Sequence, residues 1–263
     1  MILRRITKHV KDQNWFAVAL DFFIVLAGIL IAFQITNWNE AQSERAELAR
    51  AEIALQADLG RNYFNAAERV SLTECRMAQL SGLADRLLAP GDVWEGMPRN
   101  APDTLFLRAI EPVLRSPNRI WGSRIWQAGL ARGTFNQMEA NQRQDLDVLF
   151  EQTEHANALQ ENIHALQARL KLLGRTTELS RTDRLRYFDI ISEIDENSVY
   201  LELIAGQIID RIEQIGVSLD EATKPEWREI LAESNTARKD IYGACAKPII
   251  LPFLEDSEVE VTP

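Results

Sequence analysis

Residues 15–35 read WFAVALDFFIVLAGILIAFQI, an apolar run whose strongly polar members are Asp21 and Gln34. As an α-helix this run spans roughly 31 Å at about 1.5 Å per residue, close to the ~30 Å hydrocarbon core of a bilayer. Trp15 and Trp38 stand at its ends, where aromatic rings prefer the headgroup level of a membrane. The run predicts a transmembrane helix over residues 15–38. A buried helix of a soluble core is the alternative, less favoured because such helices usually keep a polar stripe.

The charges that flank this span are asymmetric. Four bases precede it: Arg4, Arg5, Lys8 and Lys11. Glu40 and Glu44 follow it before the first base, Arg45. By the positive-inside tendency, residues 1–14 form a basic cytoplasmic segment and the chain after Trp38 lies outside the cytoplasm. A cleaved signal peptide is the alternative, but no convincing small-x-small cleavage site follows Phe33.

Asp21 is unusual because a carboxylate inside a spanning helix is costly and needs a compensating environment. At helical spacing Asp21, Gly28 and Ala32 share one face, and Gly28 with Ala32 forms a small-xxx-small step that permits close helix approach. The face is a candidate oligomer seam or docking surface for a membrane partner. Alternatively, Asp21 lies near enough to the cytoplasmic interface to reach water or headgroups. Both interpretations remain open.

Residues 39–253 predict an all-α protein in which the transmembrane helix continues into an antiparallel helical bundle. Apolar residues recur at helical spacing over 41–88, including Val70 and Met77, until Pro90 and Gly91. A short helix over 103–112 and short helical turns over 116–135 follow. Regular stripes then cover 146–173, 180–215 and 227–241, with capping pairs at Ser180/Asp183 and Thr223/Glu226. No sustained strand pattern is present, and residues 254–263 are expected to form an acidic, solvated tail.

The chain has two cysteines, Cys75 and Cys245. In an exported domain such a pair commonly forms a disulfide, because the compartment is oxidising. The bond would tie the C-terminal segment to the first exported helix. Two separate thiols, or pairing between subunits, are the alternatives.

Motifs for metal binding or catalysis are weak. Glu161-x-x-His164 is half of a di-iron ligand set, but a second such motif is missing from the sequence, so we expect neither metal nor cofactor. A Gly-x-Ser-x-Gly elbow and a Gly-rich phosphate loop are also missing. The formal charge of −10 argues against binding to nucleic acid. Three tryptophans in the irregular middle favour a covered satellite core over a ligand groove: Trp94, Trp121 and Trp126.

Residues 21–40, DFFIVLAGILIAFQITNWNE, resemble the signature of a family of uncharacterised bacterial single-pass membrane-anchored proteins. That signature has an acidic residue entering the span, a glycine midway and an Asn-Trp-Asn-Glu exit, here Asp21, Gly28 and residues 37–40. The stretch 126–130 is weakly similar to a later feature of the same group. The resemblance implies a bacterial inner membrane and a helical domain after the span, and it implies no activity.

Together these observations predict a non-enzymatic single-pass inner-membrane protein whose periplasmic bundle is a scaffold or accessory subunit. Its expected partners are the lipid bilayer and either further copies of itself or another membrane protein. One alternative is a periplasmic ligand-sensing bundle that signals through a partner, since about 14 residues remain inside. Another is a subunit that uses Asp21 in an ion pathway.

Overall fold

The computed structural model describes residues 15–97 and 113–255, with side chains described from Ala19 onward. The predicted cytoplasmic segment 1–14, the predicted helix over 103–112 and residues 256–263 of the predicted tail lie outside the described residues. Within the described residues the fold is all-α, as the sequence predicts, apart from one pair of two-residue strands. By its internal contacts the chain divides into two units, Met1–Arg50 and Ala51–Pro263.

The first unit contains the N-terminal part of helix α2, which runs from Trp15 to Ser71. Every side chain from Ala19 to Glu40 is exposed, although most of them are apolar. Phe22, Phe23 and Phe33 each expose more than half of their surface. This part of α2 is long and apolar enough to cross a membrane, by length and composition.

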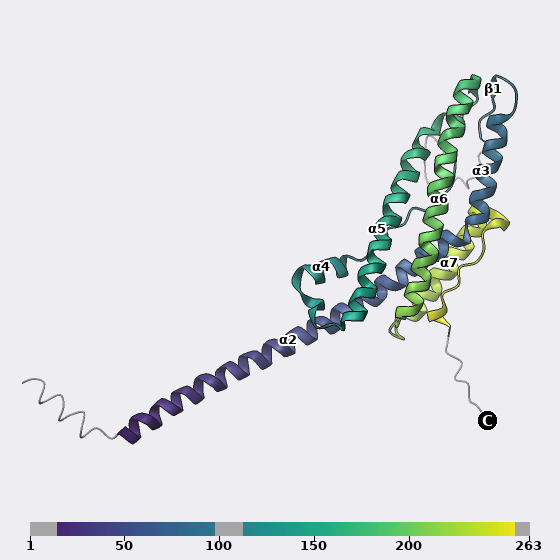
Figure 1. Ribbon diagram of the computed structural model, residues 1–263. Helices are drawn as coiled ribbons and strands as arrows, with labels where there is room; N and C mark the ends of the chain where they lie inside the picture. Colours follow the sequence, from purple (N-terminus) through teal and green to yellow (C-terminus); the bar gives the residue numbers. More distant parts are fainter. Residues whose placement is uncertain (1–14, 98–112, 256–263) are drawn as a thin grey trace, which may run out of the picture. The chain divides into compact units, whose positions relative to one another are not determined.

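The second unit is built on two long helices, α5 (Ala140–Arg169) and α6 (Arg181–Ile215). They lie side by side and are joined at one end by residues 170–180, so they form an antiparallel hairpin (Figure 1). The hairpin buries the apolar stripes that the sequence predicts, among them Leu146, Leu149, Ile163, Leu201 and Ile208. Helix α3 (Thr73–Leu88) packs against α6 and adds Leu80, Leu83 and Leu87 to the core.

Helix α6 begins and ends at the residues that the sequence predicts. The Ser180 side chain accepts a hydrogen bond from the backbone N–H of Asp183 at 3.1 Å, which caps the first turn. Gly216 follows the last residue with φ of 83°, a conformation that glycine adopts without steric cost. The predicted capping box of the last helix, α7 (Lys224–Tyr242), does not form. Thr223 donates its hydroxyl to the carbonyl of Asp220 at 2.8 Å and leaves the helix N–H groups uncapped.

The continuous helix expected over residues 41–88 is interrupted at Leu72, where α2 ends and α3 begins. The break changes the phase of the apolar stripe. Val70 and Met77, predicted to be buried, are 41% and 57% exposed, whereas Leu72 and Cys75 are buried instead. The carbonyl of Ser71 accepts the N–H of Lys247 at 3.1 Å, so a distant segment takes part in ending α2.

Shorter elements complete the second unit. Strand β1 (Val93–Trp94) pairs antiparallel with β2 (Thr177–Glu178), a pairing that the sequence does not predict. Helix α4 (Arg124–Arg132) leads into the 3-10 turn η1 (Thr134–Gln137). At Gly129 a Cβ atom would overlap the Phe135 ring, which stacks on Trp126 with centroids 4.7 Å apart.

The C-terminal segment continues from α7 through the 3-10 turns η3 (Gly243–Cys245) and η4 (Pro252–Leu254). The predicted solvated tail does not begin at Leu254, because this side chain is 5% exposed. Its carbonyl also accepts a hydrogen bond from Arg228 at 2.9 Å. Cys245 forms a disulfide with Cys75, across a sequence separation of 170 residues.

Candidate functional site

A row of buried polar residues runs along α2, beside its apolar stripe. Asp58, Asn62, Asn65 and Arg69 are spaced four, three and four residues apart, so they share one helical face, and each is at most 7% exposed. Buried polar groups need hydrogen-bond partners. These residues find theirs in residues 113–123, a stretch without regular secondary structure up to the start of α4.

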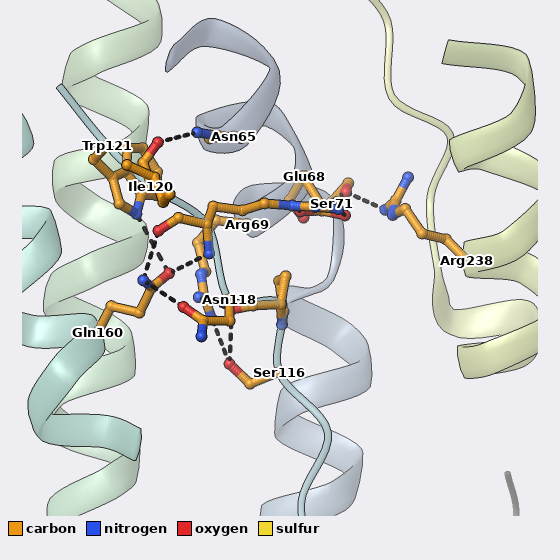
Figure 2. A network of polar contacts seen from close by, with 12 residues as sticks. Asn65, Glu68, Arg69, Ser71, Ser116, Asn118, Ile120, Trp121, Gln160 and Arg238 are labelled. Atoms are coloured by element: carbon orange, nitrogen blue, oxygen red, sulfur yellow. Dashed lines mark hydrogen bonds and ion pairs between the residues drawn. The ribbon is translucent and has the colours of Figure 1, made fainter. Parts of the chain in front are cut away.

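Amide side chains hold this stretch from two sides. Asn62 donates to the carbonyl of Gly122 at 3.0 Å and accepts its N–H at 2.8 Å. From α5, Gln160 makes the same pair of bonds with Arg119, at 2.7 and 3.0 Å. Figure 2 shows Gln160 reaching in from α5 and Asn65 from α2, where Asn65 donates to the carbonyl of Ile120. The side chains thereby satisfy backbone groups as a neighbouring strand would.

The C-terminal segment is held in a similar way. Asn235 of α7 donates to the carbonyl of Ile249 at 3.1 Å and accepts its N–H at 2.8 Å. Arg238, only 4% exposed, donates to the Ser71 hydroxyl (Figure 2) and also to the carbonyl of Lys247. Two segments far apart in sequence are therefore attached to the last turns of α2.

Glu68 supplies negative charge at the centre of this network. It is 2% exposed and accepts two hydrogen bonds from the Arg119 guanidinium, at 2.5 and 2.7 Å. Hydrogen bonding to Glu68 raises the pKa of Arg119. Burial lowers the pKa of Arg238, and the negative charge of Glu68 opposes that shift.

Arg69 is buried without an ion pair in the described part of the chain. Its two terminal nitrogens donate to the Ser116 hydroxyl at 3.0 Å and the Pro117 carbonyl at 2.9 Å, both neutral acceptors. Its Nε is buried without a hydrogen-bond partner. Burial lowers the pKa of Arg69, while Glu68 and Glu202 act in the opposite direction.

A cavity of about 30 Å³, partly open to solvent, lies next to Arg69. Its wall includes residues from both sides of the bend at Leu72, namely Arg69 on α2 and Arg76 on α3. Tyr242 lines it from the end of α7, and burial raises the pKa of this phenol. The cavity has room for about two water molecules beside the buried charge of Arg69.

The predicted membrane residues lie apart from this network in sequence and belong to the other unit. Asp21, Gly28 and Ala32 are exposed on α2, and a Cβ at Gly28 would meet no atom within 4 Å. Trp38 is 65% exposed, while the side chain of Trp15 lies outside the described residues. Their roles in membrane contact stay predictions.

Among residues 15–97 and 113–255, no group of three or more His, Cys, Asp or Glu side chains is placed to hold a metal ion. Trp94, Trp121 and Trp126 are at most 4% exposed, so they belong to the covered core that the sequence favours. They do not form one cluster with each other: Trp94 donates to the Leu173 carbonyl, whereas Trp126 packs on Phe135 and Phe150.

The sequence does not predict the buried polar row, because the apolar stripe over residues 41–88 assigns no role to the polar residues beside it. A signal was nevertheless present in the spacing of Asp58, Asn62, Asn65 and Arg69. A second signal is Pro117 and Gly122 in the stretch that these residues hold, which disfavour a helix there.

Comparisons of the chain with protein-family models, with curated proteins and with solved structures found no match.

His164 offers a test of the environment around this network. Burial, followed by the positive charge of Arg69, lowers its pKa from the model-peptide value of 6.5. Because the unfolded chain then binds the proton more readily, the stabilising effect of a neutral His164 is present above about pH 6.5 and is lost below it. We expect His164→Gln to reduce the loss of stability between pH 7.5 and 5, as measured by urea unfolding in detergent micelles.

His155 provides the matched control for this experiment. It lies on the same helix, α5, and is exposed. His155→Gln should leave the pH dependence of the free energy of unfolding as it is in the unmutated chain. An equal effect of both substitutions would contradict the assignment to His164.

Proposed function

We propose that this protein is a single-pass inner-membrane protein whose periplasmic helical domain serves as a scaffold or accessory subunit. The observation that carries the proposal is the apolar surface of α2 between Ala19 and Trp38, which no described part of the chain covers. Water is an unfavourable solvent for such a surface, and lipid is a favourable one. The basic residues before the span favour a cytoplasmic N-terminus.

The proposed contact within the membrane is the face of Asp21, Gly28 and Ala32. A helix partner approaching this face meets small residues, so the backbones can come close together. The Asp21 carboxylate can then accept a hydrogen bond from a donor on a second copy of the chain or on another membrane protein. The network around Glu68 supports the same function, because it fixes two long irregular segments to one helix and creates a defined surface.

Photo-crosslinking in intact membranes tests the contact face. A photoreactive amino acid at Ala32 should trap a defined protein product, either a dimer of the chain or one reproducible partner. Leu30 lies about 180° around the helix from Asp21 and provides the matched control, which should label mainly lipid. Equal protein products from both positions, or none from Ala32, would contradict the proposed face.

The topology needs its own measurement. Alkaline phosphatase fused after Pro263 should be active if the domain is periplasmic, because the enzyme requires an oxidising compartment. Green fluorescent protein at the same position should then stay dark. The opposite pattern would overturn the orientation.

A ligand-sensing domain is the second candidate. The observation in its favour is the cavity at the bend between α2 and α3, since α2 is the helix that also contains the apolar span. A ligand that binds better to one geometry of this bend would shift the population of that geometry. A partner protein in the membrane would have to detect this change in geometry and transmit the signal.

A further inference from the structure

Helix α2 ends at Ser71, although the surrounding sequence favours a continuous helix. Neither proline nor glycine lies between residues 61 and 81, and α3 begins at Thr73, directly after the break at Leu72. The two helices nevertheless run in different directions (Figure 1). Since a helix break has an identifiable cause, an interaction from outside this stretch must stabilise it.

The last carbonyl groups of α2 have donors that a continuous helix would not use. In a continuous helix the carbonyls of residues 69–71 would accept the N–H groups of residues 73–75. The first carbonyl instead accepts the N–H of Leu72 at 3.3 Å, and the second accepts the Thr73 hydroxyl at 2.9 Å. The third accepts the N–H of Lys247 at 3.1 Å. Of these three donors, only Lys247 comes from a distant segment.

The first turn of α3 lacks the same three helical bonds. No acceptor in residues 15–97 or 113–255 takes the N–H groups of residues 73–75, and no side chain caps this helix end. Cys75 is 1% exposed, so its N–H has little access to water. An unpaired buried donor is costly. A continuous helix would remove this cost, because the carbonyl of Ser71 would accept the N–H of Cys75.

The segment that supplies the Lys247 donor is bonded covalently to this turn of α3. Cys245 forms the disulfide with Cys75, the residue whose N–H would otherwise reach the carbonyl of Ser71. Arg238 also donates a hydrogen bond to the Ser71 hydroxyl (Figure 2). The C-terminal part of the chain thus binds both the backbone and the side chain of Ser71.

We propose that the disulfide is a redox-sensitive latch that keeps α2 and α3 as two separate helices. A dithiol reductant attacks the sulfur of Cys245, the more exposed of the two residues, and Cys75 leaves as a thiolate and takes up a proton. The second thiol of the reductant displaces Cys245, so two electrons and two protons pass from the dithiol to the cysteines. Lys247 then leaves Ser71, whose carbonyl accepts the N–H of Cys75, and the helix becomes continuous through Leu72.

This latch goes beyond both candidate functions and does not depend on either of them. It couples the thiol state of the surroundings to the geometry between α2 and α3. Because α2 also contains the apolar span, the latch acts at the C-terminal end of that same helix.

Double electron–electron resonance on the full chain in detergent micelles tests the latch. Spin labels on genetically encoded ketone side chains at Ala57 and Ser81, both exposed, leave the cysteines unmodified. A continuous helix separates these positions by about 36 Å, at about 1.5 Å per residue. We expect a shorter distance in the oxidised chain and a population at the continuous-helix distance after reduction with dithiothreitol. A chain that is fully reduced by thiol titration but keeps the oxidised distance would overturn the proposal.

A matched pair of labels on α6 reports whether the second unit stays folded. Arg186 and Asp210 are exposed, have the same separation in sequence and lie on an unbroken helix. Their distance should be about 36 Å in both redox states. If this distance also changes, reduction has unfolded the second unit, and substitution of Lys247 in the oxidised chain decides the question.

Two substitutions of Lys247 separate the hydrogen bond from the disulfide. Lys247→Pro removes the N–H donor and leaves Cys75 and Cys245 bonded, whereas Lys247→Ala removes the side chain and keeps the donor. In the oxidised state we expect the proline variant, but not the alanine variant, to populate the longer distance between the labels at Ala57 and Ser81. An unchanged distance in a folded proline variant, or the same change in both variants, would refute the latch.

Discussion

Replacing Cys75 with serine should lower the free energy of unfolding of the second unit by on the order of 5 kcal/mol, the largest effect that we expect from one substitution. The disulfide between Cys75 and Cys245 closes a loop of 170 residues, and the chain-entropy cost of the unfolded state increases with loop length. Unfolding by guanidinium chloride in detergent micelles, followed by tryptophan fluorescence, measures the change.

Loss of the disulfide should also increase the local unfolding of the C-terminal segment. Cys245 lies two residues before Lys247, whose N–H donates to the carbonyl of Ser71 at the end of α2. Without the disulfide, the segment that buries Ile249, Leu251 and Leu254 is attached by hydrogen bonds, by the exposed ion pair between Lys247 and Glu74 and by apolar contacts. Hydrogen exchange should therefore increase first at residues 246–254.

The control for this prediction is chemical. A Cys75→Ser/Cys245→Ser double variant should be as stable as the single variant, and a reducing agent should destabilise only the unmutated chain. If thiol titration shows full reduction and the unfolding midpoint stays where it was, the stabilising role of the bond is contradicted.

The regular helices could be predicted from the sequence because their information is local. Leu146 through Leu173 and Ile191 through Ile212 repeat at helical spacing, and Ser180 and Gly216 mark the ends of α6 by their own chemistry. Packing of these stripes against each other leaves few alternatives to an antiparallel hairpin.

The break at Leu72 could not be predicted, because its cause lies far away in the chain. Neither proline nor glycine occurs between residues 61 and 81 to indicate an end of the helix. The carbonyl of Ser71 is instead taken by Lys247, a contact that exists only after the C-terminal segment has folded back. The exposure of Val70 and Met77 follows from this tertiary contact rather than from their own hydrophobicity.

The cavity beside Arg69 was hidden from the sequence for a related reason. Arg69, Arg115 and Glu202 come from three segments, and no spacing rule connects them. An arginine on a helix also favours a solvated position, since burial of its charge is costly. The buried position of Arg69 becomes evident only when its hydrogen-bond partners on other segments are known.

Replacing Glu68 with alanine should destabilise the same domain by roughly 3 kcal/mol, because removal of one partner of a buried ion pair leaves the other charge uncompensated. Arg119 loses two hydrogen bonds, at 2.5 and 2.7 Å. Its guanidinium retains partial access to water, which limits the loss. Arg69 and Arg238 cannot reach water in this way, since they are 5% and 4% exposed, and both lose a neighbouring negative charge.

The matched control is Glu74, six residues further along the chain. It forms an ion pair with Lys247 at 2.6 Å, but both side chains are more than half exposed. Solvent screens such a pair, so Glu74→Ala should change the free energy of unfolding by less than about 1 kcal/mol. Comparison of the two variants in the same detergent and salt separates the effect of burial from that of charge.

Glu68→Gln distinguishes the two contributions of the Glu68 side chain. The amide is nearly isosteric and can accept from Arg119, but it has no charge to stabilise Arg69 and Arg238. If hydrogen bonding to Arg119 dominates, the glutamine variant should be much more stable than the alanine variant. If the electrostatic effect of the Glu68 charge on the buried arginines dominates, both variants should unfold at nearly the same denaturant concentration.

We expect the glutamine and alanine variants to unfold at nearly the same denaturant concentration, because two of the three arginines near Glu68 are buried without a carboxylate of their own in the described residues. A glutamine variant as stable as the unmutated chain would show that the charge of Glu68 does not hold the network together.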